Sequence, residues 1–268
     1  MTIIEALILG IVQGITEFLP ISSDGHLELG KAMMNVQAAD NLLFTVLVHG
    51  ATVCSIIIVF WKDIVHLLRQ LLRFEWNEDK QYIAKLALSM IPVGLVGLFL
   101  EKKLAALFSG NVLLVGILLI INGIILLASR ITLRAPTQNI SYADALLIGL
   151  AQSVAVLPGI SRSTCTVSTA LMLGIERTEA VRFSLLMVIV PILGATVLKA
   201  KDFLEAPASA NEPIMPYIIG FFAAFLTGLL ACNWLMTIVR KGKISYFAYY
   251  CFAVGLLAII WHIGKTGV

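Results

Sequence analysis

Several apolar runs of roughly 18–20 residues constrain the fold of this chain more than any other feature, because a helix of about that length crosses the ~30 Å hydrocarbon layer of a bilayer. Of the 268 residues, 59% are hydrophobic and 13% are Asp, Glu, Lys or Arg, whereas about 25% are charged in a typical soluble domain. A soluble protein of this composition could not cover its surface with polar groups. The sequence therefore predicts an all-α integral membrane protein.

Charge and cysteine content exclude several other classes of protein. The formal net charge is only +3, and no basic stripe interleaved with aromatic residues is present, so no nucleic-acid partner is expected. The four cysteines are dispersed and include no Cys-x-x-Cys pair, so neither a cysteine metal site nor a disulfide framework is predicted. The N-terminus lacks a basic region with a small-residue cleavage site, and we expect no removable signal peptide.

The long apolar runs fall into two groups of three predicted spans. The first group is 42–61, 82–100 and 112–129, and the second is 181–198, 217–239 and 244–261. Within the first group, a hydrophilic loop with an amphipathic piece is expected at 62–80.

Two shorter apolar segments precede each group of spans, with a polar, proline-containing turn between them. Residues 145–152, Ala-Leu-Leu-Ile-Gly-Leu-Ala-Gln, echo residues 6–13, Ala-Leu-Ile-Leu-Gly-Ile-Val-Gln. Leu157-Pro158 echoes Leu19-Pro20, one residue out of step. We expect each pair of segments to form a re-entrant helical hairpin, because non-helical backbone at membrane depth is tolerated where protein or a water-filled cavity surrounds it.

A re-entrant hairpin returns the chain to the side of the membrane from which it entered, and three spans then carry it to the opposite side. The second unit is therefore inverted relative to the first. The sequence thus predicts a single membrane domain, 1–268, made of two inverted repeats, 1–130 and 141–264, each a re-entrant hairpin plus three transmembrane helices. The two turns would enter from opposite faces and meet near the midplane, where transporters of this architecture place their site.

Basic loop residues set the expected orientation, because they gather on the cytoplasmic side of membrane proteins. One side carries Lys62, Arg69, Arg73, Lys80, Arg130, Arg134, Arg177, Arg182, Arg240, Lys241 and Lys243. The other carries Lys31, Lys102, Lys103, Lys199, Lys201 and Lys265. The first side is predicted to be cytoplasmic, and both termini and the first hairpin then face outward.

Glu17 is the sharpest single functional signal. A carboxylate in an apolar helix is costly, and by default it faces the protein interior and marks a function. Gln13 lies four residues earlier and projects from the same helical face. The alternative is that Glu17 only sits at an interface or caps a neighbouring group.

The turn that follows the Pro20 break gathers further reactive groups. Ser22 and Ser23 supply two hydroxyls, and Gly25 allows backbone N–H groups to approach an anion closely. His26 can donate or accept a proton near neutral pH. A lone histidine near a helix end is usually structural, but its place after an intramembrane glutamate favours a functional role.

Residues 158–166, Pro-Gly-Ile-Ser-Arg-Ser-Thr-Cys-Thr, have the chemistry of a phosphate cradle. Arg162 offers a planar, permanently charged fork that matches phosphate oxygens. Backbone N–H groups at a helix start after Gly159 add donors. Three hydroxyls surround the arginine, those of Ser161, Ser163 and Thr166. An arginine at this depth needs an anionic partner, either Glu17 or a bound phosphate, and a purely structural ion pair is the alternative.

Other polar residues within the spans carry a weaker signal. We expect His49, Lys85, Asn122 and Asn233 to serve packing or local hydrogen bonding rather than catalysis.

At these motifs the sequence resembles the undecaprenyl-pyrophosphate phosphatase family, the bacitracin-resistance type. That family has Glu/Gln-x-x-x-Glu leading into Phe-Leu-Pro-x-Ser-Ser-x-Gly-His, and later Pro-Gly-x-Ser-Arg-Ser-x-x-Thr. Here the first motif is Gln13 and Glu17 with residues 18–26, and the second is residues 158–166. The likeness extends over nearly the whole chain in length and span pattern. Asp24 departs from the frequent Ser or Thr after the serine pair.

The resemblance implies hydrolysis of the pyrophosphate on a C55 polyprenyl lipid to the monophosphate, which recycles the carrier for peptidoglycan synthesis and gives bacitracin resistance. It also implies a site open to the outer face of the bacterial plasma membrane. The catalytic set carried over is Glu17, His26, Ser22, Ser23 and Arg162. The phosphate-binding set is Arg162, Ser161, Ser163, Thr166 and Gly159, with Gln13 in support.

Several alternatives stay open at this point. Either Ser22 or Ser23 would attack the phosphorus or orient a water that does. Because position 13 is Gln, a metal-binding carboxylate pair is not expected, although Mg²⁺ or Ca²⁺ could bridge Glu17 and phosphate. A transporter or flippase of an anionic polyprenyl lipid is the alternative function. A homo-oligomer is compatible with the sequence but not indicated by it.

Overall fold

The computed structural model describes residues 1–36, 41–108, 111–157, 159–205 and 213–266, and these ranges contain eleven helices and no β-strand. The first half holds α1 (Ile3–Phe18), α2 (Ser23–Met34), α3 (Asn41–Val59), α4 (Trp61–Leu71), α5 (Glu78–Phe108) and α6 (Val112–Ala128). The second half holds α7 (Tyr142–Val154), α8 (Arg162–Met172), α9 (Arg177–Glu205), α10 (Met215–Arg240) and α11 (Ser245–Thr266). The prediction of an all-α protein is confirmed.

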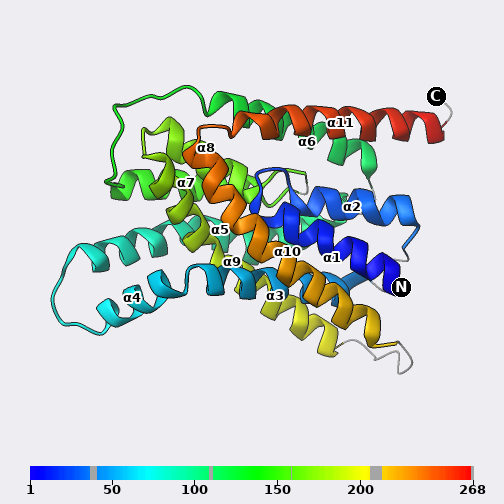
Figure 1. The fold of residues 1–268 in the computed structure, drawn as a ribbon, viewed down its shortest axis with the longest axis horizontal. Coiled ribbons are helices and arrows are strands. Elements are labelled where there is room, and N and C mark those ends of the chain that lie inside the picture. Colours follow the sequence, from blue (N-terminus) through cyan, green and yellow to red (C-terminus); the bar gives the residue numbers. More distant parts are fainter. Residues whose placement is uncertain (37–40, 109–110, 158, 206–212, 267–268) are drawn as a thin grey trace.

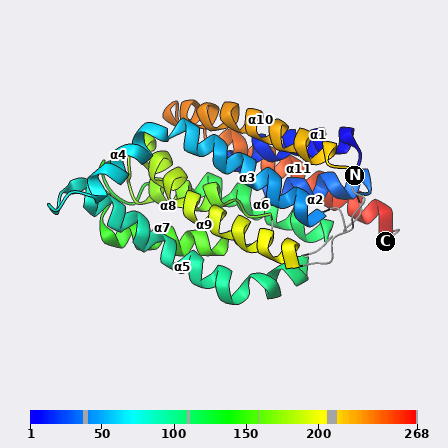
Figure 2. The same ribbon diagram turned by 90° about the horizontal axis from the view of Figure 1, so that it is seen from below.

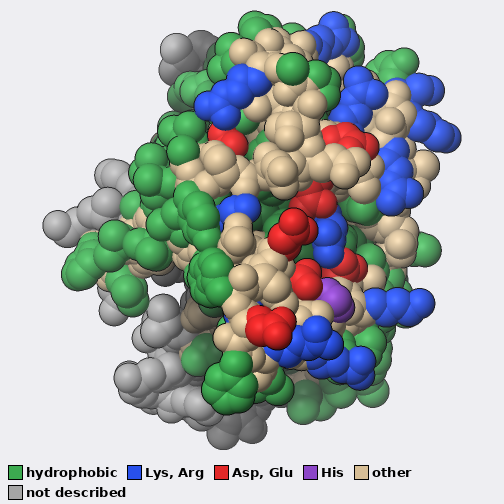
Figure 3. All heavy atoms as spheres, turned by 90° about the vertical axis from the view of Figure 1, so that its left-hand side faces the viewer, with side chains coloured by type: hydrophobic (Ala, Val, Ile, Leu, Met, Phe, Trp, Pro, Cys, Tyr) green, Lys and Arg blue, Asp and Glu red, His purple; other side chains and the backbone are tan. Residues whose placement is uncertain are grey.

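The helices form an elongated bundle with two distinct ends (Figure 1). One end carries α4 and the connection between α6 and α7, and the other carries the N-terminus and the C-terminal end of α11 (Figures 1 and 2). Seen from the α4 end, the surface shows many Lys, Arg, Asp and Glu side chains (Figure 3). This is the end at which the predicted cytoplasmic loops lie.

Each predicted span coincides with a helix. Three helices are long and apolar enough to cross a bilayer, in the segments Glu78–Phe99, Met215–Arg240 and Ser245–Lys265. A fourth candidate is the pair Leu43–Val59 and Trp61–Leu71, which is bent by 76°. The amphipathic piece expected in the loop after the first span is the second helix of this pair, α4. α6 is apolar but only 17 residues long.

Both predicted hairpins are pairs of short helices with a break between them. α1 ends at Phe18, and Pro20 follows within the turn. Ser22 then adopts the positive φ of 70°, and its side chain caps α2 by accepting a hydrogen bond from the Gly25 N–H. In the second pair, Ser161 caps α8 in the same way, by accepting from the Thr164 N–H. Pro158 lies outside the described residues.

The glycines shared by the two echoing sequences permit close helix packing. A Cβ at Gly10 would lie 2.5 Å from the Gly220 carbonyl oxygen, so α1 approaches α10 through backbone. A Cβ at Gly149 would overlap the carbonyl oxygen of Ser89, so α7 approaches α5 in the same manner. The first helix of each hairpin is therefore held against a long helix from the other half of the chain.

Asn122 of α6 ties the two hairpin turns together. Its Nδ2 donates to the Pro20 carbonyl at 3.0 Å, and its Oδ1 accepts from the Ser161 N–H at 2.9 Å. Thr164 Oγ1 donates to the same Pro20 carbonyl at 2.9 Å, and Ser163 Oγ donates to the Leu19 carbonyl at 3.2 Å. These bonds satisfy backbone groups that the helix breaks leave unpaired in a buried place.

Replacing Asn122 with Ala should lower the free energy of unfolding by about 1–3 kcal/mol, because it leaves the buried Ser161 N–H without a partner and removes one of the two bonds to the Pro20 carbonyl. Thermal or denaturant unfolding in detergent measures this loss. Asn233→Ala is the matched control, since Asn233 is exposed and its Nδ2 bonds only to Leu229 of its own helix among the described contacts. Equal losses in the two variants would contradict the bridging role.

Candidate active site

Glu17 lies where the two hairpins meet, with its side chain only 3% exposed. Its Oε1 accepts from Arg162 Nη2 at 2.8 Å. Its Oε2 accepts from Gln13 Nε2 at 2.9 Å and from Ser23 Oγ at 2.6 Å. Four of the residues singled out from the sequence are thus joined directly, and both carboxylate oxygens are hydrogen-bonded.

Arg162 reaches Glu17 because it opens α8 just after the second break. The pair spans 145 residues of sequence and is a charge-assisted hydrogen bond as well as an ion pair. The Arg162 side chain is 21% exposed, so the arginine lies nearer to the surface than the carboxylate that it contacts. A ligand entering the site would therefore reach the arginine first.

The two serines of the first turn have different roles in the geometry. Ser23 is the first residue of α2, and its hydroxyl donates a hydrogen bond to the Glu17 carboxylate. The Ser22 hydroxyl instead accepts from the Gly25 N–H at 3.3 Å, as the helix cap. A carboxylate that accepts the hydroxyl proton is the arrangement of a nucleophile with its general base, and it involves Ser23.

His26 lies one turn into α2, and among the described residues no hydrogen bond joins it to Glu17. Its Nδ1 is 2.8 Å from the Ser22 carbonyl oxygen and its Nε2 is 2.9 Å from the Tyr250 hydroxyl. Because a carbonyl only accepts, Nδ1 carries a proton, and a neutral ring accepts from Tyr250 at Nε2. The Tyr250 ring of α11 also stacks on the imidazole, with ring centroids 5.5 Å apart.

Three contributors were not assigned to the site by the sequence. His49 of α3, expected to serve packing, places its Nε2 3.8 Å from Glu17 Oε2 and 3.4 Å from Asp24 Oδ1. Tyr250 and Asn122 come from α11 and α6. The rule that polar residues inside membrane spans mark function could have identified His49 and Asn122. No local pattern identifies Tyr250.

The hydroxyls of the second hairpin are engaged within the protein. Ser161 Oγ and Ser163 Oγ are 2.8 Å apart, and Thr166 Oγ1 donates to the Arg162 carbonyl at 3.0 Å. Gly159 has φ +112°, and a Cβ there would overlap Leu118, so the position requires glycine. Binding of phosphate by these residues stays a prediction.

Two helix N-termini point at the Glu17 region, because α2 begins at Ser23 and α8 begins at Arg162. Helix N-termini present unpaired N–H groups and a partial positive charge, and they bind anions. A cavity of about 10 Å³ lies between Glu17, Arg162 and α9, too small for a phosphate group. The Asp24 side chain, 45% exposed, marks the side on which this cluster reaches the surface.

The residues around Glu17 fit a divalent cation only together with a phosphate ligand. Within the described ranges no three His, Cys, Asp or Glu side chains are grouped as metal ligands. The Oε1 atom of Gln13, however, is buried beside Glu17 without a hydrogen-bond partner. Mg²⁺ often takes one or two carboxylates and completes its shell with substrate phosphates and water. Gln13 and Glu17 therefore offer a partial oxygen site.

Comparison with known proteins agrees with the motifs. The family described as Bacitracin resistance protein BacA matches residues 6–257. An undecaprenyl-diphosphatase of Christiangramia forsetii is 47% identical over 265 residues, covering 97% of this chain and 98% of that protein. Those of Bacteroides fragilis and Oceanobacillus iheyensis are 45% and 35% identical, covering 96% and 97% of this chain and 97% of each relative. Since these matches span nearly all of it, the chain belongs to the bacitracin resistance protein BacA family.

Proposed function

We propose that this protein hydrolyses undecaprenyl pyrophosphate to undecaprenyl phosphate and inorganic phosphate. The observation that carries the proposal is the hydrogen-bonded chain from Ser23 through Glu17 to Arg162, which joins a hydroxyl, a base and a phosphate-binding cation. The relatives named undecaprenyl-diphosphatase support the same substrate. A transporter of an anionic lipid would need Arg162 but has no need for a hydroxyl paired with a base.

The geometry leads to a mechanism in which Arg162 exchanges Glu17 for substrate. The terminal phosphate approaches Arg162 and the N-termini of α2 and α8, which stabilise charge in the transition state. Ser23 Oγ attacks the terminal phosphorus while its proton passes to Glu17, and the bond to the polyprenyl phosphate breaks. His26, when doubly protonated, gives a proton to the departing phosphate. Water then attacks the phosphorus and the bond to Ser23 Oγ breaks; Glu17 returns its proton to that oxygen and the now neutral His26 accepts the proton of the water, which restores both groups.

Phosphate release from a C55 diphosphate in detergent micelles tests the function. The wild-type protein should turn over, and Glu17→Gln should lower the rate about 10²–10⁴-fold, because a general base contributes a factor of that order. Glu5→Gln is the control, since Glu5 is outside the site and Gln preserves its capping box. No release by the wild-type protein, with lipid movement in vesicles, would favour the transporter.

The assignment of Ser23 as nucleophile predicts a covalent phosphoenzyme. With substrate labelled on the terminal phosphate, acid-quenched wild-type protein and Ser22→Ala should carry label, whereas Ser23→Ala should carry none and lose turnover. Ser153→Ala, whose hydroxyl bonds only to Gly149 of its own helix among the described contacts, controls for loss of a serine. Turnover of Ser23→Ala near the wild-type rate would exclude this role.

We further propose that Glu17 and Gln13 hold a divalent cation, Mg²⁺ or Ca²⁺, together with the substrate. When bound, the ion would offset negative charge on the diphosphate. Because the protein offers a single carboxylate at this point, the ion should bind weakly without substrate. Excess chelator should therefore lower turnover in the wild type, and added Mg²⁺ or Ca²⁺ should restore it. Unchanged turnover in chelator would remove the ion from the scheme.

We also propose that residues 1–130 and 141–264 are inverted repeats with re-entrant hairpins. Helix packing supports this, since matching α1, α3, α5 and α6 to α7, α9, α10 and α11 reproduces the main contacts. Under this match the contact between α1 and α10 corresponds to that between α7 and α5, and the contact between α3 and α10 corresponds to that between α9 and α5. The pairs α6–α11 and α3–α9 each correspond to themselves. Gly10 and Gly149 occupy equivalent contacts.

The proposed location is the bacterial plasma membrane, with the hairpin of α1 and α2 entered from outside and the α4 end in the cytoplasm. In cells, a membrane-impermeant thiol reagent should label Met33→Cys, where Met33 is 69% exposed, but not Glu75→Cys in the α4–α5 connection. Both should react in permeabilised cells, and a Cys54→Ser background removes the exposed native thiol. Labelling of Glu75→Cys alone in intact cells would reverse the orientation.

A further inference from the structure

A cavity of about 700 Å³ lies apart from the Glu17 site. Its walls come from the C-terminal ends of α6, α8 and α10 and the N-terminal ends of α9 and α11. α8 runs from Arg162 at the Glu17 carboxylate to Met172 near this cavity, roughly 16 Å along the helix axis at ~1.5 Å per residue. No residue contacting Glu17 lines it, and its volume is within the ~300–1,000 Å³ range of small-molecule sites.

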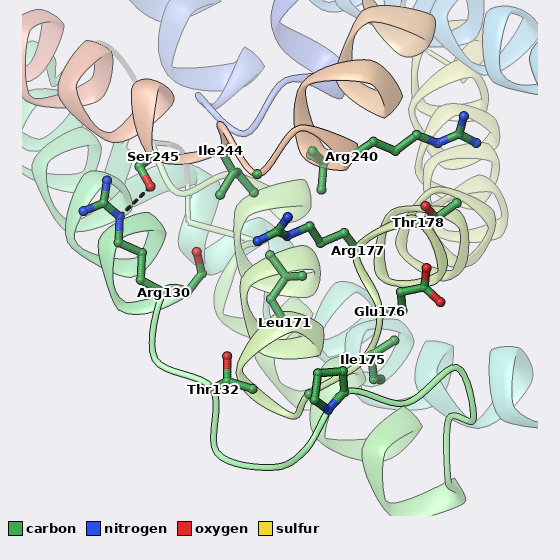
Figure 4. A pocket seen from close by; sticks show the side chains of 15 residues that line it. Arg130, Thr132, Leu171, Ile175, Glu176, Arg177, Thr178, Arg240, Ile244 and Ser245 are labelled. Atoms are coloured by element: carbon green, nitrogen blue, oxygen red, sulfur yellow. Dashed lines mark hydrogen bonds between the residues drawn. The ribbon is translucent and has the colours of Figure 1, made fainter.

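Two arginines, Arg130 just after α6 and Arg177 at the start of α9, line this cavity. In Figure 4 the Arg177 side chain extends toward the side of the cavity on which Arg130 lies, Arg130 turns its guanidinium group to Ser245, and Arg240 extends away, past Thr178. Arg130 is oriented by a hydrogen bond from its Nε to Ser245 Oγ at 2.7 Å. Arg177 lies against Gly242, where a Cβ would come within 2.9 Å of Nη1. The Arg177 guanidinium group can therefore occupy this position only because residue 242 has no side chain.

The cavity lining does not neutralise these two charges. Its one carboxylate, Glu176, accepts a hydrogen bond from Gln138 Nε2 at 2.6 Å. Neither Arg130 nor Arg177 has an ion pair among the described residues, although Arg134 and Arg182 at the same end pair with Asp144 and Asp63, each at 2.7 Å. Two arginines without an ion pair among the described residues thus leave the cavity lining with positive charge that an anion would offset.

The positive-inside rule alone does not explain why these arginines line a cavity. It requires basic residues near the cytoplasmic boundary and places no condition on where their side chains point. Arg69 and Arg73 satisfy it at the same end of the molecule and, unlike Arg130 and Arg177, do not line the cavity, although all four residues are exposed. The rule therefore does not account for the position of Arg130 and Arg177 in the cavity lining.

We propose that this cavity is a second anion site, which binds a phosphate-bearing ligand through Arg130 and Arg177. Guanidinium groups match phosphate oxygens in charge and shape. Basic pockets between membrane helices on the cytoplasmic side bind lipid head groups. The phosphate can belong to an anionic membrane lipid or to a soluble phosphate compound. Hydroxyls of Thr132 and Thr178 add donors.

Binding of two defined probes to the purified full-length protein tests this site. Lipid binding is measured by native mass spectrometry with phosphatidylglycerol, against phosphatidylcholine as the neutral lipid. Soluble binding is measured by the shift in unfolding temperature with inorganic phosphate, against chloride at equal ionic strength. The variants are Arg130→Gln/Arg177→Gln and the matched control Arg69→Gln/Arg73→Gln, which removes the same charge from the same end.

Wild type and control should bind one of the two probes, and the Arg130→Gln/Arg177→Gln variant should bind that probe about tenfold or more weakly, because each charged hydrogen bond contributes more than a neutral one. The probe that binds identifies the source of the phosphate. If the glutamine variant unfolds, Arg130→Lys/Arg177→Lys keeps the charge but loses the fork, and weaker binding by it supports the site. Binding of neither probe, or equal binding by all variants, would overturn the proposal.

Discussion

The ion pair between Glu17 and Arg162 is the interaction on which the central region depends, because each partner would be costly to bury alone. Breaking such a pair in a protein interior typically costs about 3–5 kcal/mol, since it leaves an uncompensated charge. Glu17 is 3% exposed and Arg162 follows it by 145 residues, so the pair forms only when both helix breaks are in place. Gln13 and Ser23 complete the bonding of the carboxylate.

The same requirement explains why the second hairpin is rich in hydroxyls. The break at Pro20 leaves the Leu19 and Pro20 carbonyls without helical partners, and no solvent is available in the core to bond them. Ser163, Thr164 and Asn122 donate to these carbonyls, so the second turn supports the first. A phosphate that recruits the Ser163 hydroxyl would have to replace the bond to Leu19. Hydroxyls in this motif can therefore be structural even where their spacing suggests a phosphate cradle.

The helices and both helix breaks could be predicted from the sequence, because apolar run length and proline act locally. Glu17, Arg162, Ser23 and Gln13 could be predicted to meet, since a buried charge needs a partner and the two echoing segments suggested paired hairpins. Polarity inside a span marks His49 and Asn122 as candidates, but their partners are far away in sequence, so the sequence does not place them at this site, and no local pattern marks Tyr250. The 76° bend between α3 and α4 was also missed, as no proline or glycine marks it.

The two arginine clusters differ in what a phosphate must displace. At Arg162 an incoming phosphate competes with Glu17, and displacing the carboxylate frees the group that the proposed mechanism uses to accept the Ser23 proton. Loss of the ion pair weakens phosphate binding at Arg162, but it also releases Glu17 to act as the base. At the proposed site of Arg130 and Arg177 a phosphate would displace no carboxylate among the described residues, and it would offset positive charge that the cavity lining does not neutralise. The first arrangement suits a substrate that is bound, converted and released, whereas the second suits a ligand that stays.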